Sequence, residues 1–240
     1  MTAARTLEAM SALAPIAFVL VFAAVLGLVG WLVVRTARRN RAPRDPAVSA
    51  GLARLAAAKG WTYRPRDDGF LRRFRGYPFG HGGRSRPAAD LVTGTHRGRE
   101  FACFRYVPAR SLPAGEYAAR IRHARVVAVS LPTPVPRVLV TPAAGTPRRV
   151  RRFTTGDDAF DRAYAVGTDD EPFARRLLTD PVRRWLLDNP PAGALRLAGP
   201  DVITWHADDG GFAADMVEPA VDSLCDLLDR LPADAVRASG

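Results

Sequence analysis

A run of 22 residues without a charged side chain, at positions 13–34, opens the hydrophobic and polar pattern of the chain. As an α-helix this run would be about 33 Å long, enough to cross the hydrocarbon core of a bilayer. A cleaved signal peptide usually has an apolar region of about 7–15 residues followed by a small-residue cleavage site, whereas this run ends in WLVVRTARRNR. A buried core helix would rarely lack charge for so long at a chain end. The pattern therefore predicts one transmembrane helix over residues 13–34.

Arginines are concentrated directly after this run. Only Arg5 and Glu8 carry charge before it, and five arginines follow it: Arg35, Arg38, Arg39, Arg41 and Arg44. Because arginine-rich flanks stay in the cytoplasm, we expect a single-pass protein of the cell membrane, with its N-terminus outside and the rest of the chain in the cytoplasm. The five arginines form the predicted membrane-surface site, where they would contact anionic headgroups of the lipid bilayer.

Three small residues share one face of the predicted transmembrane helix: Ala23, Gly27 and Gly30. Small residues at helical spacing let two membrane helices approach closely. One interpretation is therefore a homodimer, or another protein partner, that packs on this face. The other is that these are ordinary lipid-facing residues, and the incomplete match to G-x-x-x-G favours it.

From Asp45 onward the pattern is that of a folded domain. Asp45 and Pro46 are typical of a helix start, and apolar residues then recur at helical spacing until Gly60, a residue typical of a helix end. Short apolar segments bounded by turn residues follow, and they predict a sheet. Its single strands are expected at 61–65, 124–132 and 136–142, and hairpins are expected at 90–107, turning at Arg97-Gly98, and at 194–210, turning at Gly199-Pro200-Asp201.

Helical periodicity predicts most of the second half. Asp170 and Asp180 are the expected N-caps of two short helices, whose core-facing positions would be Phe173, Leu177, Val182, Trp185 and Leu186. A last helix over residues 216–231 would have an apolar inner face and an acidic outer face. The predicted fold class is α+β, with the transmembrane helix followed by a cytoplasmic domain that has an antiparallel sheet and a C-terminal helix. The predicted divisions are an extracytoplasmic N-terminus at 1–12, the transmembrane helix at 13–34, a basic linker at 35–45, the cytoplasmic domain at 46–234 and a tail at 235–240.

Charge is unevenly distributed along the chain, whose formal net charge is +11. Residues 51–155 carry a net of +16 and residues 156–240 a net of −9. The two halves could face each other in one fold, the basic half could face an anionic surface, or each half could meet its own partner. Lys59 is the only lysine, which we interpret as the codon bias of a high-GC genome, so the arginine content is weak evidence for nucleic-acid binding.

No pattern of catalytic, cofactor-binding or metal-binding residues is found in the sequence. The four histidines lack ligand spacing, the adjacent aspartates are placed as helix caps or on opposite faces of strands, and the two cysteines form no C-x-x-C: these residues are His81, His96, His123, His206, Asp157-Asp158, Asp169-Asp170, Asp208-Asp209, Cys103 and Cys225. Separate cysteines suit a reducing cytoplasm. We therefore expect no cofactor and favour a protein that is not an enzyme.

Several segments together resemble an uncharacterised bacterial family. They are GWTYRPRDDGFLRRFRGYPFGHGG, VTGTHRGREFACFRY, FDRAYAVGTDDEPFARRLLTDPVRRWLLD and VITWHADDG. They are similar to membrane-anchored proteins of high-GC species with a domain of unknown function. The resemblance implies an α+β cytoplasmic domain behind a membrane helix, and it implies no activity or catalytic residue.

The leading functional hypothesis is a membrane-anchored cytoplasmic binding or scaffold module at the inner leaflet. One alternative is a membrane-tethered enzyme of unknown class. The other is nucleic-acid binding through the basic first half, where arginines alternate with aromatic residues between Tyr63 and Phe79. The acidic second half makes a nucleic-acid partner the less favoured expectation.

Overall fold

The computed structural model describes Trp31 and residues 45–74, 76–79, 88–106, 124–143, 152–191, 193–207 and 212–236. Apart from Trp31, all of these residues belong to one compact unit that extends from Arg44 to Gly240.

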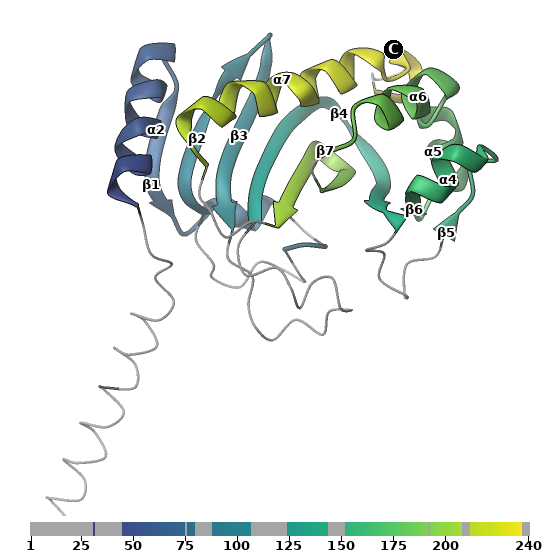
Figure 1. Cartoon of the computed structure of the whole chain (residues 1–240), viewed down its shortest axis with the longest axis horizontal. Coiled ribbons are helices and arrows are strands. Elements are labelled where there is room, and N and C mark those ends of the chain that lie inside the picture. Colours follow the sequence, from purple (N-terminus) through teal and green to yellow (C-terminus); the bar gives the residue numbers. More distant parts are fainter. Residues whose placement is uncertain are drawn as a thin grey trace, which may run out of the picture. The chain divides into compact units, whose positions relative to one another are not determined.

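The framework of this unit is an antiparallel sheet of seven strands in the order β1-β2-β3-β4-β6-β5, in which β7 also pairs with β4 (Figure 1). The strands are β1 Thr62–Asp67, β2 Ala88–His96, β3 Arg99–Tyr106, β4 Ala124–Pro142, β5 Arg152–Phe153, β6 Tyr164–Thr168 and β7 Ala194–Ala207. With its helices, the unit is an α+β domain.

The long strands β4 and β7 form an arch that links the two ends of the sheet. The first part of β4 pairs with β3, its last part pairs with β6, and β7 pairs with both parts. Between these parts the β4–β7 register shifts, from Ser130↔Asp201 to Val135↔Gly199. The exposed Pro132 and Pro134 lie in this interval, where β4 has no ladder partner on β7, so their missing N–H groups cost no hydrogen bond there.

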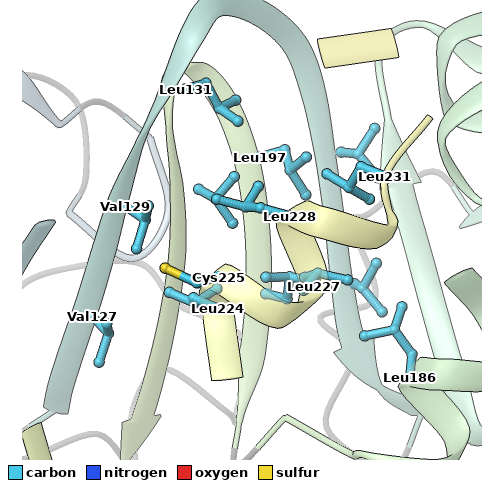
Figure 2. Packing of buried hydrophobic residues seen from close by; sticks show 14 of the residues in the cluster. Val127, Val129, Leu131, Leu186, Leu197, Leu224, Cys225, Leu227, Leu228 and Leu231 are labelled. Atoms are coloured by element: carbon cyan, nitrogen blue, oxygen red, sulfur yellow. The ribbon is translucent and has the colours of Figure 1, made fainter. Parts of the chain in front are cut away.

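Helices cover mainly one face of the sheet, which we call the helix face. They are α2 Pro46–Lys59, α4 Asp158–Ala163, α5 Glu171–Leu177, α6 Asp180–Asp188, α7 Ala214–Arg230 and α8 Ala233–Val236. Figure 1 shows α7 crossing this face. In Figure 2, Leu224 and Leu228 of α7 lie inside the β4 arch, opposite Val129 and Leu131. This cluster is the larger of two hydrophobic cores.

The second core lies on the opposite face of the sheet, which we call the open face. Its centre is aromatic: Phe74 stacks on Phe104 with ring centroids 5.8 Å apart, and Phe79 stacks on Phe74 at 5.1 Å. A single turn of 3-10 helix, η1 Phe70–Arg73, covers this core. Among the described residues, η1 is the element over this core, and because it is so short it covers only part of the open face.

Ion pairs join the basic and acidic halves of the chain. The outer face of α7 receives side chains from α2 and from the β2–β3 turn, in the ion pairs Lys59–Glu218 at 2.8 Å, Arg97–Asp226 at 2.6 Å and Arg99–Asp229 at 2.6 Å, and His96 is hydrogen-bonded to Asp222 at 2.7 Å. Arg97 also contacts Asp229. These contacts support the interpretation in which the two halves face each other within one fold.

The main correction to the predicted fold class concerns its transmembrane helix. Within the part of the chain that the structure describes, no helix is both long and apolar enough to span a membrane. Apart from Trp31, the predicted span 13–34 lies outside the described residues. The membrane and transmembrane assignments are therefore withdrawn, while the topology and localisation that rested on them stay untested predictions.

Three of the predicted sheet segments are also corrected. Residues 124–132 and 136–142 are parts of the one strand β4, and residues 194–207 form the one strand β7 instead of a hairpin. Gly199 has a φ of 57° and lies at the bend of β7. The proline-rich segment and the Gly-Pro pair mark bends within the strands and not turns between them. Here β4 and β7 bend together and stay paired with each other before and after the bend.

Corrections in the helices are smaller. The N-cap of α6 is Thr179, and Asp180 is the first helical residue, where it contacts Arg183. Trp185 was expected in the core, but it is half-buried, with the Arg230 guanidinium 5.4 Å from its ring centroid. The caps Asp45, Asp170 and Gly60 are confirmed.

Candidate functional site

A groove of about 520 Å³ lies on the part of the open face that η1 leaves uncovered. Side chains from β1, β2, β3, β4, β7 and η1 line it, together with the end of α2. The described residues that line it are Lys59, Gly60, Trp61, Thr62, Arg64, Phe70, Arg73, Thr93, Gly94, Thr95, Glu100, Phe101, Ala102, Ala128, Ser130 and Asp201.

Small side chains form the floor of the groove. Thr62 pairs with Thr93, Thr93 with Ala102, and Ala102 with Ala128, so one row of small residues crosses four neighbouring strands. Directly paired residues point to the same face of a sheet. The next row toward the second core contains Leu91, Phe104 and Val126, which η1 covers. The face is therefore hollowed where the side chains become small.

The η1 turn forms one wall of the groove, with Phe70 and Arg73. Asp67 fixes the start of this turn, since its carboxylate accepts hydrogen bonds from the backbone N–H groups of Gly69 at 2.9 Å and Phe70 at 2.8 Å. Arg64 donates to the same carboxylate at 2.8 Å, and this bond is the largest contribution that lowers the pKa of Asp67. Phe70 packs edge-on against Phe104, with ring centroids 5.6 Å apart.

A hydrogen-bonded group closes the end of the groove beside β7. The Arg73 guanidinium donates to Asp201 at 2.6 Å and to the Ser130 hydroxyl at 3.4 Å. The Asp201 side chain is only 4% exposed. Burial raises the pKa of Asp201, and the charge of Arg73 opposes part of that rise.

Glu100 is the one acidic lining residue for which the described part of the chain provides no ion-pair partner. It is exposed and lies on β3 directly opposite Thr95 of β2. The three basic residues of the described lining, by contrast, are each paired with a carboxylate: Lys59 with Glu218, Arg64 with Asp67, and Arg73 with Asp201.

Trp61 lies at the edge of the groove near the end of α2, where it packs against the helix-face core. Its ring lies directly over Gly94, where an added Cβ would be 2.3 Å from the indole Cδ1 atom. The indole Nε1 donates to the Thr95 carbonyl at 3.2 Å, and the ring packs edge-on against Phe101 at 4.8 Å. Glycine is therefore required at position 94 for this indole to lie flat against the sheet.

The predicted membrane-surface arginines are not part of this site. Arg35, Arg38, Arg39, Arg41 and Arg44 lie outside the described residues, as do Ala23, Gly27 and Gly30. Their roles stay predictions.

Most of the histidines and aspartates that were considered as catalytic or metal-binding candidates, where they are among the described residues, have structural roles. His96 pairs with Asp222, Asp157 and Asp170 cap helices, and Asp169 binds Arg137 at 2.5 and 2.7 Å. No set of three His, Cys, Asp or Glu side chains among the described residues could hold a metal ion. His81, His123, Asp208 and Asp209 lie outside the described part.

The aromatic residues of the basic segment between Tyr63 and Phe79 belong largely to the core. Phe74 and Phe79 are buried. Arg64, Arg66 and Arg73 are paired with Asp67, Asp68 and Asp201. The described part of this segment therefore offers no row of free aromatics and cations to a nucleic acid.

Sequence reasoning missed the groove because its residues form no motif. The available signal was the small or hydroxyl-bearing residue at every second position of neighbouring strands, such as Thr93 and Thr95 on β2. Only the strand register brings these positions together.

Comparisons with known proteins give one informative result. No family model matches the chain, and no curated protein matches it. Among solved structures, the chain is similar to the mycobacterial trehalose monomycolate transport factor A, TtfA, with a TM-score of 0.50 and 17% sequence identity over 78% of this chain and 98% of that one. At this identity the likeness concerns the fold alone.

Proposed function

We propose that this protein is a non-enzymatic binding module that holds its ligand or partner in the groove of the open face. The observation that carries the proposal is the row Thr62, Thr93, Ala102 and Ala128, whose small side chains form the floor of the groove. A concave site with a few polar groups is the usual form of a small-molecule site.

The chemistry of the lining favours binding over catalysis. A nucleophile or general base needs a partner that activates it, and the described residues of the lining include neither histidine nor cysteine. Its buried carboxylate, Asp201, is already engaged by Arg73. The similar mycobacterial protein bears the name of a transport factor, which suits a role in binding.

The proposal is tested by photo-cross-linking from the groove. A photoreactive phenylalanine analogue replaces Thr95 on the groove rim, and a matched variant carries it at Thr154, an exposed threonine beside β5. After irradiation in cells of the source organism, the intact mass of the purified protein reveals adducts. We expect an adduct from position 95 that is absent from position 154.

A second substitution separates groove binding from surface collisions. Thr93→Trp fills the floor, and it should abolish the adduct from position 95 while leaving the unfolding midpoint close to that of the parent. Equal adducts from both positions, or an adduct that survives Thr93→Trp in a folded protein, would refute the proposal.

A further inference from the structure

The groove presents hydroxyl groups and already neutralised cations to its ligand. Thr62, Thr93, Thr95 and Ser130 supply four hydroxyls, each of which can donate and accept a hydrogen bond. The guanidinium of Arg73 and the carboxylate of Glu100 add a planar donor and a planar acceptor at the sides.

The charges of the lining disfavour a strongly ionic ligand. An anion would meet Glu100, whereas the cations among the described lining residues, Lys59, Arg64 and Arg73, already have carboxylate partners. A cation would find, among the described lining residues, the one carboxylate of Glu100 without an ion-pair partner. A neutral ligand with many hydroxyls is not repelled by any of these charged groups, and its hydroxyls can form hydrogen bonds with each of them.

The wall supplies an apolar complement. The Phe70 ring is half-buried on η1 and lines the groove beside the hydroxyl-bearing floor. Sugar rings have an apolar C–H face and a rim of hydroxyls, so one ring can pack on Phe70 while its hydroxyls contact the floor. A volume of about 520 Å³ is within the range of sites that hold a small organic ligand.

We propose that the groove binds a neutral saccharide of one or two rings. This inference rests on the proposed binding function and specifies its ligand class. Because the site is open and polar, we expect weak affinity for a free sugar, with a Kd of roughly 1–10 mM.

The test is methyl NMR of the full chain titrated with maltose and with its isomer α,α-trehalose. Thr93, Ala102 and Ala128 report on the groove. Val127 and Val129 are the internal control, because they flank Ala128 on β4 but point into the helix-face core. At least one disaccharide should shift the groove methyls and leave the control methyls in place.

Variants and salt distinguish a sugar from a charged ligand. Thr93→Trp should abolish the shifts, and Glu100→Gln, which keeps the shape of the side chain, should weaken binding only about 3–10-fold. Sugar binding should change less than about twofold between roughly 0.05 and 0.5 M salt, whereas binding of a charged peptide would fall steeply.

Tetralysine and tetraglutamate are the competing probes. If a peptide shifts the groove methyls and neither disaccharide does, the saccharide proposal is wrong and the binding function stands. If no probe shifts them at about ten times the expected Kd, the saccharide proposal is again wrong, and the cross-linking from position 95 decides the binding function separately.

Discussion

At the scale of single residues, Arg73 connects the wall of the groove to its far end. It is partly exposed, and it donates to the buried Asp201 and to Ser130. A buried carboxylate that loses its cation keeps the cost of its desolvation. Removal of Arg73 would therefore leave the buried, ionised carboxylate of Asp201 without its cation.

Arg73→Ala should lower the free energy of unfolding by about 1–3 kcal/mol at pH 7. The pKa of Asp201 is already raised by burial, and without Arg73 it should rise further. The cost arises from the ionised carboxylate, so it is present above the folded-state pKa and disappears below the pKa of the unfolded chain. Urea unfolding at pH 7 and near pH 3.5 should thus show the two proteins converging in acid. Arg72→Ala, an exposed change on the same turn, is the control and should have little effect at either pH.

At the scale of elements, α7 is held by two different interactions. Its inner face packs leucines into the β4 arch, as Figure 2 shows, and its outer face pairs with the β2–β3 turn. Ion pairs as exposed as these are typically worth about 0–1 kcal/mol, whereas each buried leucine is worth several times more. The apolar face therefore anchors α7, and the carboxylates fix which part of the sheet lies beside it.

Asp229→Asn should lower stability by no more than about 1 kcal/mol at low salt and neutral pH. Hydrogen bonds from Arg99 lower the pKa of Asp229 most, with Arg97 adding to the effect. A carboxyl with a depressed folded-state pKa stabilises the fold above its unfolded-state pKa, and that stability is lost as the pH falls through the folded-state value. Thermal unfolding should show the difference at pH 7 and not near pH 3. Asp188→Asn, at an exposed carboxylate of α6, is the matched control; an equal loss there would contradict a specific role for Asp229.

Local sequence signals predicted the elements whose ends depend on local chemistry. Asp45 and Gly60 bound α2, and Arg97 and Gly98, both with positive φ, make the turn between β2 and β3. The continuity of β4 and β7 could not be predicted in the same way. Pro134 and Gly199 are local signs of a break, and only pairing between residues 55 or more positions apart keeps the strands continuous. The groove escaped prediction for the same reason, because Thr62 and Ala128 reach one floor through the register of four strands.

At the scale of the whole molecule, the helix-face core unites elements from both ends of the chain. Cys103 of β3 and Cys225 of α7 are both buried in it. Burial raises the pKa of both thiols. Two reporters in one core, from distant parts of the sequence, can show whether the domain opens as one unit.

Neither thiol should react with a disulfide reagent in the native protein at pH 8. Each should be protected at least about 10³-fold relative to the unfolded chain, because labelling requires opening of the core. The variants Cys103→Ser and Cys225→Ser isolate the two rates, measured in increasing urea. Equal protection indicates one cooperative unit. Faster labelling of Cys225 would mean that α7 detaches alone, contrary to our expectation.

The pairing of β4 with β7 has a consequence during synthesis of the protein. β4 ends at Pro142 and β7 begins at Ala194, so ribosomes working at about 5–20 residues per second would leave β4 without this partner for roughly 3–10 s. Throughout that interval a long, apolar strand edge is open to pairing with other chains. The nascent chain is thus an expected client of chaperones until its last quarter emerges, and messages truncated before Ala194 should yield aggregates instead of a smaller folded domain.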